Sequence, residues 1–183
     1  FGKAALRMFD GFAETIGLEK VKEALIISHT LENKISDCGK IQYKYAPHPL
    51  PDYNSLEAGK VAKRFVKNIK TNDHLLCLIS GGGSSMMVSP EPPLSFEEKK
   101  SLIANLMMLG IPEREINEIR KAMSSIKGGK LIERIPPVAI DNIFLSDERS
   151  HKFDAISSGP TILKHNFSAA KVVAKYDLTA HIP

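Results

Sequence analysis

The feature that most constrains the fold is an uninterrupted apolar run followed at once by glycine and hydroxyl residues. Residues 75–79 read Leu-Leu-Cys-Leu-Ile, and residues 80–85 read Ser-Gly-Gly-Gly-Ser-Ser. A short apolar run without alternation is typical of a central parallel strand that is covered on both faces. The sequence therefore predicts an α/β fold in which a polar loop lies at the carboxyl end of a buried strand.

Strand and helix patterns alternate along the rest of the chain. Strands are predicted at residues 24–28, 40–45, 74–79 and 138–145. Helices are predicted at residues 3–16, from the proline-rich turn at 47–52 to about residue 69, and at 95–109, 112–123 and 167–176. This alternation favours a layered α/β/α sandwich with right-handed crossovers around a mostly parallel, Rossmann-like sheet. We expect residues 1–183 to form one α/β domain.

Composition narrows the class of ligand. The chain has 183 residues, of which 43% are hydrophobic and 25% charged, and no apolar run approaches the ~20 residues that cross a bilayer. Its net charge is +4, and its Lys and Arg residues are spread along the chain with acidic residues between them, unlike the basic stripe of a nucleic-acid-binding protein. Cys38 and Cys77 lie far apart and suggest neither a zinc cluster nor a disulfide framework. We expect a cytoplasmic protein that binds a small anion, and neither a membrane nor a nucleic acid.

The glycine-rich segment 80–85 is the first candidate site. Glycine lets backbone N–H groups approach an anion, and hydroxyls can donate further hydrogen bonds, so the segment predicts a phosphate or carboxylate site. Its spacing matches neither GxxxxGK[ST] nor GxGxxG. A tight turn that needs positive φ explains the same residues equally well. The residues concerned are Ser80, Gly81, Gly82, Gly83, Ser84 and Ser85.

Basic residues elsewhere could bind the same anion. Lys127 lies in a second glycine-rich segment, residues 124–130, which suits either a mobile phosphate clamp or an ordinary solvated turn. Arg120 shares a helix face with Glu113 and either binds an anion or forms a surface ion pair. His48 stands between two prolines, so its imidazole either meets a ligand or lies in solvent.

Two further residues are candidates for catalysis. Asp147 follows a predicted strand, where a carboxylate accepts a hydroxyl proton or holds Mg²⁺ beside phosphates, or merely caps the next turn. Lys3 stands near a predicted helix start and either neutralises phosphoryl charge or lies in solvent. The histidines show no metal-ligand spacing, so no metal site is assigned.

These pieces together resemble one family, the glycerate 2-kinases of the MOFRL-associated type. Any one motif is weak, but seven occur in the family's order and cover nearly the whole chain. They are Gly2-Lys3-Ala4, His48-Pro49-Leu50-Pro51-Asp52, the segment 78–85, Ile116-Asn117-Glu118-Ile119-Arg120-Lys121, Ser125-Ile126-Lys127-Gly128-Gly129-Lys130-Leu131, Ser146-Asp147 and Ser158-Gly159-Pro160-Thr161.

The resemblance implies an ATP- and Mg²⁺-dependent kinase that phosphorylates the 2-hydroxyl of D-glycerate to give 2-phosphoglycerate. It implies that Lys3 and Asp147 are the catalytic residues, in a cleft between this domain and a smaller C-terminal domain. Because the chain starts at Phe1, just before the Gly2-Lys3-Ala4 motif, we interpret it as truncated. We expect the family's first helix, opening strand and C-terminal MOFRL domain to be missing and the fragment alone to be inactive.

The chain departs from the family at one motif. The family usually continues its Ser-Asp pair with one or two hydrophobic residues and then Gly-Asp, whereas residues 148–151 read Glu-Arg-Ser-His. The alternative is therefore a degenerate anion- or nucleotide-binding protein of the same fold. The hypothesis of a serine hydrolase that uses Ser84 has weak support, since the loop does not match the G-x-S-x-G motif. The sequence is compatible with a homo-oligomer.

Overall fold

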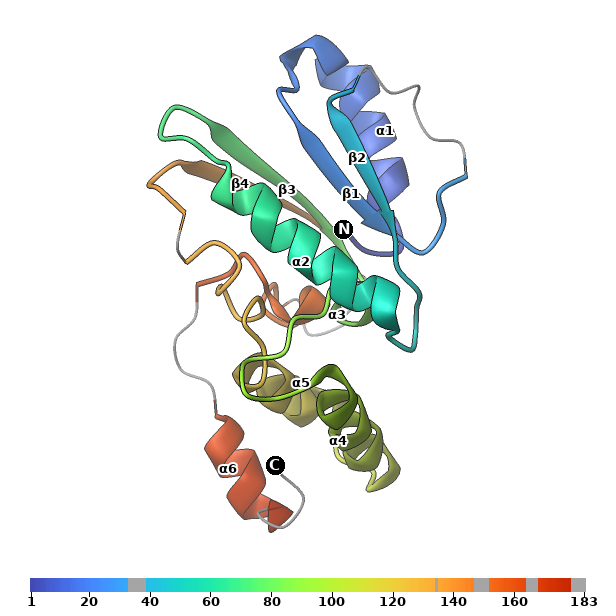
Figure 1. The fold of residues 1–183 in the computed structure, drawn as a ribbon, viewed down its shortest axis with the longest axis vertical. Helices are drawn as coiled ribbons and strands as arrows, with labels where there is room; N and C mark the ends of the chain where they lie inside the picture. Colours follow the sequence, from blue (N-terminus) through green and yellow to red (C-terminus); the bar gives the residue numbers. More distant parts are fainter. Residues whose placement is uncertain (33–38, 134, 147–151, 164–167, 179–183) are drawn as a thin grey trace.

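Helices and strands alternate along the chain, as Figure 1 shows in sequence colours. The computed structural model describes residues 1–32, 39–133, 135–146, 152–163 and 168–178. The strands are β1 Ala24–Ser28, β2 Ile41–Tyr45, β3 His74–Ser80 and β4 Ala139–Leu145. The helices are α1 Ala5–Ile16, α2 Tyr53–Lys67, α3 Gly83–Met86, α4 Phe96–Met108, α5 Glu113–Ala122 and α6 Ala169–Lys175, with 3₁₀ turns at Leu18–Lys20 and Ile156–Ser158.

The strands form two parallel pairs. β1 pairs with β2 from Ala24 opposite Ile41, and β3 pairs with β4 from His74 opposite Ala139. The α/β class and the parallel pairing predicted from the sequence are confirmed. Within the described residues, the two pairs form separate two-stranded sheets (Figure 1).

The first two residues connect the two sheets through their backbone. The Phe1 amino group donates to Leu78 O at 2.7 Å, Ser80 N donates to Phe1 O at 3.1 Å, and Gly2 N donates to Ile27 O at 3.1 Å. Phe1 therefore pairs with β3 in the manner of a parallel strand, while Gly2 reaches β1. A cavity of about 410 Å³ lies alongside, lined by residues of β1, β3, α1 and α2.

Helices cover both faces of β1. Ile26 packs with Ala5, Leu6 and Phe9 of α1, whereas Ile27, the next residue, packs in the cluster that contains Ala58, Ala62 and Val66 of α2. Because successive side chains of a strand point to opposite faces, α1 and α2 lie on opposite sides of β1. This is the layered α/β/α arrangement that the sequence predicts.

A second core joins the remaining long helices, which lie together in Figure 1. Its buried members include Leu102 and Leu106 of α4, Ile116 and Ile119 of α5, and Val172 of α6. The α4 helix begins at a capping box, in which Ser95 Oγ accepts from Glu98 N and the Glu98 carboxylate accepts from Ser95 N. None of the described helices is both long and apolar enough to span a bilayer.

Candidate functional site

The candidate loop turns sharply at the end of β3. The strand runs through Ser80, and the four-residue helix α3 begins at Gly83, so part of the predicted loop is helical. Gly82 has a φ of +88°, and a Cβ there would lie 2.9 Å from Lys3 Cγ and 3.2 Å from His48 Nδ1. Gly82 therefore lies directly against two other predicted site residues, and its missing side chain makes room for both.

Backbone hydrogen bonds hold Lys3 at this loop. Lys3 N donates to Gly81 O at 2.8 Å, and Ala4 N donates to Ser80 Oγ at 3.0 Å. A Cβ on Gly2 would lie 2.4 Å from Ser80 Oγ, so the two segments touch. Lys3 itself is exposed. The main chain of Lys3 is thus fixed while its side chain remains accessible from solvent.

His48 lies on the same side of the loop. Its Nδ1 is 3.1 Å from Ser85 Oγ, and Ser85 Oγ donates to Gly82 O at 3.1 Å. The imidazole is exposed, and it follows β2 by only a few residues. The structure thus brings together Lys3, His48 and Gly82, which are far apart in sequence.

Lys127 supports the loop from inside the protein. Its side chain is only 1% exposed, and its ammonium group donates to Ser84 O at 2.9 Å. Burial, and then the charges of Lys99 and Arg120, lower the pKa of Lys127 well below its ordinary value. The structure therefore shows Lys127 as a fixed, buried brace beneath Ser84, rather than as a mobile clamp or a solvated turn.

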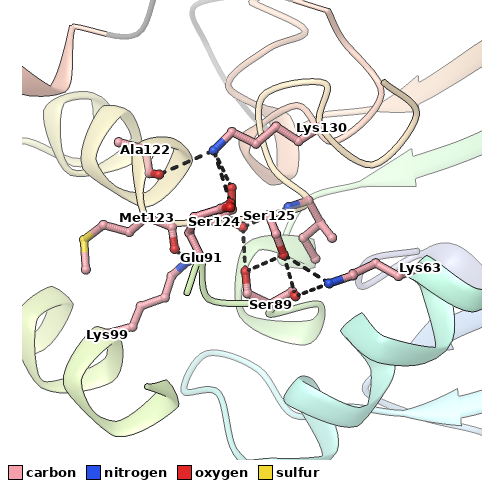
Figure 2. Close-up of polar contacts among 10 residues, drawn as sticks. Lys63, Ser89, Glu91, Lys99, Ala122, Met123, Ser124, Ser125 and Lys130 are labelled. Carbon is pink, nitrogen blue, oxygen red and sulfur yellow. Dashed lines mark hydrogen bonds and ion pairs between the residues drawn. The ribbon is translucent and has the colours of Figure 1, made fainter. Parts of the chain in front are cut away.

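Lysines also hold the segment that carries Lys127. Lys99 Nζ donates to Met123 O at 2.7 Å, and Lys130 Nζ donates to Ser124 O at 2.6 Å, where α5 ends. Figure 2 shows these residues together. Cations are favoured at the carbonyl end of a helix. Burial, followed by the charges of Lys130 and Arg120, lowers the pKa of Lys99 to about 7.

A hydroxyl pair anchors the other side of the same segment. Ser89 Oγ lies 2.7 Å from Ser125 Oγ, and Lys63 Nζ of α2 lies 3.4 Å from each of these oxygens (Figure 2). Ser125 N also donates to Ser89 O at 3.0 Å. The segment 124–130 is therefore fixed at several points before it reaches Ser84.

Arg120 does not reach the loop directly. Its side chain is 14% exposed and forms an ion pair with Glu113, as one of the two sequence interpretations predicts. It also donates to Asn117 Oδ1 at 3.0 Å, and Asn117 Oδ1 accepts from Ser158 Oγ at 3.3 Å. Ser158 Oγ in turn lies 2.7 Å from Ser84 Oγ. Arg120 thus connects to the loop through two intervening side chains.

Two serines of the 3₁₀ turn contact the candidate loop but were not among the predicted site residues. Ser157 Oγ donates to Ser80 O at 2.7 Å, and Ser158 bonds to Ser84. Both have positive φ, 53° and 62°, which non-glycine residues rarely adopt and which clusters at functional sites. The only sequence signal was the Ser158-Gly159-Pro160-Thr161 motif, which does not indicate what the serines contact.

Asp147 and residues 148–151, including His151, lie outside the described residues. Within the described part of the chain, no three His, Cys, Asp or Glu side chains come together as metal ligands. These residues therefore do not form a protein cage for Mg²⁺, which kinases usually hold with one or two carboxylates and substrate phosphates. What the described residues do offer is an exposed cation, an imidazole and a glycine turn at one sheet end, which is where α/β folds bind ligands.

Comparisons with known proteins identify relatives over the whole length of the chain. The family model described as "Domain of unknown function (DUF4147)" matches residues 1–183. The glycerate kinase of Homo sapiens is 32% identical over 196 residues, covering 100% of this chain and 38% of that protein. The D-glycerate 2-kinase of Thermotoga maritima is 35% identical over 182 residues, covering 97% of this chain and 42% of that protein.

A solved structure shows the same fold. The crystal structure of glycerate kinase from Thermotoga maritima superposes with a TM-score of 0.85 at 33% identity, over 97% of this chain and 43% of that one. The chain thus spans about two fifths of the length of the glycerate kinases that it matches. Because the family model covers every residue from 1 to 183, the chain belongs to the DUF4147 family.

Proposed function

We propose that this chain is the phosphate- and substrate-binding part of a longer kinase that transfers a phosphoryl group from ATP to the 2-hydroxyl of D-glycerate, giving 2-phosphoglycerate. The observation that carries the proposal is the position of Lys3, whose backbone is bonded to Gly81 and whose stem lies against Gly82. The names of the full-length relatives support the substrate and the kind of reaction.

Lys3 would stabilise the charge of the transferring phosphoryl group. Phosphoryl transfer depends mainly on positioning and on electrostatic stabilisation of the equatorial oxygens, so a cation on a fixed backbone is suited to it. The exposure of Lys3 lets a nucleotide approach from solvent. His48, at 3.1 Å from Ser85 Oγ, would contact the anionic end of a ligand in the same loop.

The remaining predicted residues receive different roles. Asp147 would accept the proton of the glycerate hydroxyl or help to hold Mg²⁺, which the nucleotide would bring with it. Ser80 and Gly81 would hold the Lys3 segment, as their bonds to Ala4 and Lys3 indicate. Lys127 and Arg120 would act on the loop from behind, because both have partners within the protein.

The proposal also concerns the longer protein. We propose that a second, MOFRL-type domain completes the active site, that the described fragment alone is inactive, and that the enzyme is cytoplasmic.

A serine hydrolase is disfavoured by a specific contact. Ser84 Oγ bonds to Ser158, whereas the nearby imidazole of His48 bonds to Ser85, so Ser84 is not paired with a base there.

The test is an assay of the full-length enzyme for ADP release with D-glycerate, ATP and Mg²⁺, with ³¹P NMR to identify the phosphorylated hydroxyl. We expect 2-phosphoglycerate from the wild type and losses of at least about 100-fold in Lys3→Ala and Asp147→Asn. An enzyme that binds nucleotide or glycerate without turnover would refute the kinase and establish the degenerate binding protein, with residues 148–151 as the suspected cause.

A further inference from the structure

Three hydrogen bonds lead from Arg120 to the Ser84 hydroxyl, and the chemistry of their donors determines their directions. Arg120 Nη1 lies 3.0 Å from Asn117 Oδ1. A guanidinium group has N–H donors and no acceptor. The Asn117 atom that faces Arg120 must therefore be the carbonyl oxygen, which determines the orientation of the amide.

The orientation of the Asn117 amide then determines which atoms donate in the hydrogen bonds of Ser158 and Ser84. Ser158 Oγ lies 3.3 Å from the same Asn117 oxygen and is completely buried. Because that oxygen has only lone pairs, the Ser158 hydroxyl is the donor in this contact. Ser84 Oγ lies 2.7 Å from Ser158 Oγ. Either hydroxyl can donate in this bond, and with the Ser158 hydrogen directed at Asn117, Ser84 is the donor.

Ser84 therefore has no second hydrogen to donate to a ligand. A hydroxyl has one hydrogen and two lone pairs, so Ser84 Oγ can act toward a ligand only as an acceptor. A phosphate or carboxylate oxygen placed there would be repelled, because both it and Ser84 Oγ would offer only lone pairs. A ligand hydroxyl, in contrast, could donate its hydrogen to Ser84 Oγ. Ser84 is partly exposed, and Lys127 holds its carbonyl group at 2.9 Å.

We propose that Asn117 and Ser158 are positioning residues that fix the Ser84 hydroxyl as the acceptor of a hydrogen bond from a substrate hydroxyl group. This inference rests on the proposed function, in which the substrate is a small hydroxy acid. Anionic groups of the ligands then bind on the side of the loop that faces Lys3 and His48. Ser84 thereby favours hydroxylated acids over their deoxy analogues.

The kinetic test uses the full-length enzyme and the Ser158→Ala variant, in which the Ser84 hydrogen is released. We expect the KM for D-glycerate to rise about fivefold, in line with one misdirected hydrogen bond, while kcat stays within about twofold. Inorganic phosphate, used as an inhibitor, should bind more tightly, because Ser84 can now donate to it. Merely structural damage would weaken both ligands, so a parallel loss would overturn the proposal.

Variants of Asn117 distinguish the effect of hydrogen-bond direction at Ser84 from the effect of side-chain packing at residue 117. Asn117→Asp keeps an oxygen facing both Arg120 and Ser158, so it should retain wild-type preferences within about twofold. Asn117→Leu removes the acceptor and should reproduce the Ser158→Ala pattern. Ser101→Ala is the control, because it removes an exposed serine hydroxyl on α4 that has no part in these bonds. Wild-type preferences in Asn117→Leu would contradict the proposal.

Neutron diffraction of the deuterated chain gives a reading that does not depend on activity. Deuterium on Ser84 directed at Ser158, with deuterium on Ser158 directed at Asn117, would support the inference. Deuterium on Ser158 directed at Ser84 would overturn it, whatever the enzyme phosphorylates. A wild-type enzyme that fails to phosphorylate glycerate would refute the proposed function instead, and the neutron result would then decide the inference by itself.

Discussion

The two glycine-rich segments, residues 80–85 and 124–130, have similar compositions but different surroundings. Gly82 borders the side chains of Lys3, His48 and Met86, and Lys3 and His48 are exposed. Gly129 instead borders backbone atoms of Ile162 and Leu163, and Lys127 beside it is buried. Glycine therefore makes room for an exposed cation in one segment and for tight backbone packing in the other.

The largest expected effect is on catalysis, and it distinguishes Lys3 beside the first segment from Lys127 in the second. Lys3→Ala should lower kcat/KM of the full-length enzyme by about 100- to 1000-fold, because a charge at the transferring group is lost. Its free energy of unfolding should stay within about 0.5 kcal/mol of wild type, because Lys3 is exposed. Assays of ADP release and urea unfolding measure the two quantities, with Lys67→Ala of α2 as an exposed-lysine control.

Lys127→Ala should do the opposite. Its buried stem and its bond to Ser84 O are both lost, so the free energy of unfolding should fall by about 3 kcal/mol. Urea unfolding of this chain measures the change. If Lys127→Ala were as stable as Lys3→Ala, the interpretation of Lys127 as a buried brace would be wrong.

The two glycines extend the comparison to the backbone. Gly129→Ala should destabilise the protein by about 3 kcal/mol, because its φ is +87° and a Cβ would lie 2.7 Å from Leu163 Cα. Gly82→Ala should cost about 1 kcal/mol, since the atoms it meets are in side chains that can move. The same Gly82→Ala change should still displace Lys3 and reduce turnover in the full-length enzyme.

Lys99 predicts how stability changes with pH near the buried segment. Its pKa is lowered to about 7 in the folded protein from an ordinary value of 10.5. Between these values the unfolded chain holds a proton that the folded chain lacks, so stability should rise with pH, by up to about 1.4 kcal/mol per pH unit. The burial penalty is fully present below pH 7.

Urea unfolding at pH 7.5 and pH 9 compares the wild type with Lys99→Met. The variant should have a flatter dependence of stability on pH, because it lacks this titrating group. Equal slopes in the two proteins would show that Lys99 is not the group responsible.

The smallest effect is expected at a glycine outside both segments. Gly11 lies inside α1, and a Cβ there would have no neighbour within 4 Å. Gly11→Ala should therefore stabilise the protein by about 0.5–1 kcal/mol through helix propensity. Thermal unfolding measures it, and a destabilised Gly11→Ala would show that available space is a poor guide to glycine substitutions in this protein.

Local patterns predicted most of the fold because they report local physics. The run Leu75–Ile79 and the alternation at 40–45 correspond to β3 and β2, and the capping pattern at Ser95 corresponds to the start of α4. The separation of the strands into two pairs was not predictable, because strand order depends on contacts between distant segments. The short helix α3 was missed because three glycines argue against helix.

The sequence indicated the candidate site residues one by one, but it did not indicate the contacts between them. Gly82, Lys3 and His48 were each candidates, yet nothing local indicated that they touch. The buried position of Lys127 contradicts the usual preference of lysine for solvent, so composition pointed toward an exposed turn. Ser157 and Ser158 act through positive φ and distant partners, and neither property has a simple sequence signal.

The bonds that tie the first residues to β3 also determine when the site can form during folding. Phe1 and Leu78 are 77 residues apart, Ala4 and Ser80 are 76 apart, and Ser84 and Ser158 are 74 apart. Each of these contacts closes a long loop, and that entropy must be lost before the bond forms. We expect the helices to form early and the site to form late, so a refolding mixture would show native helicity before it binds any ligand.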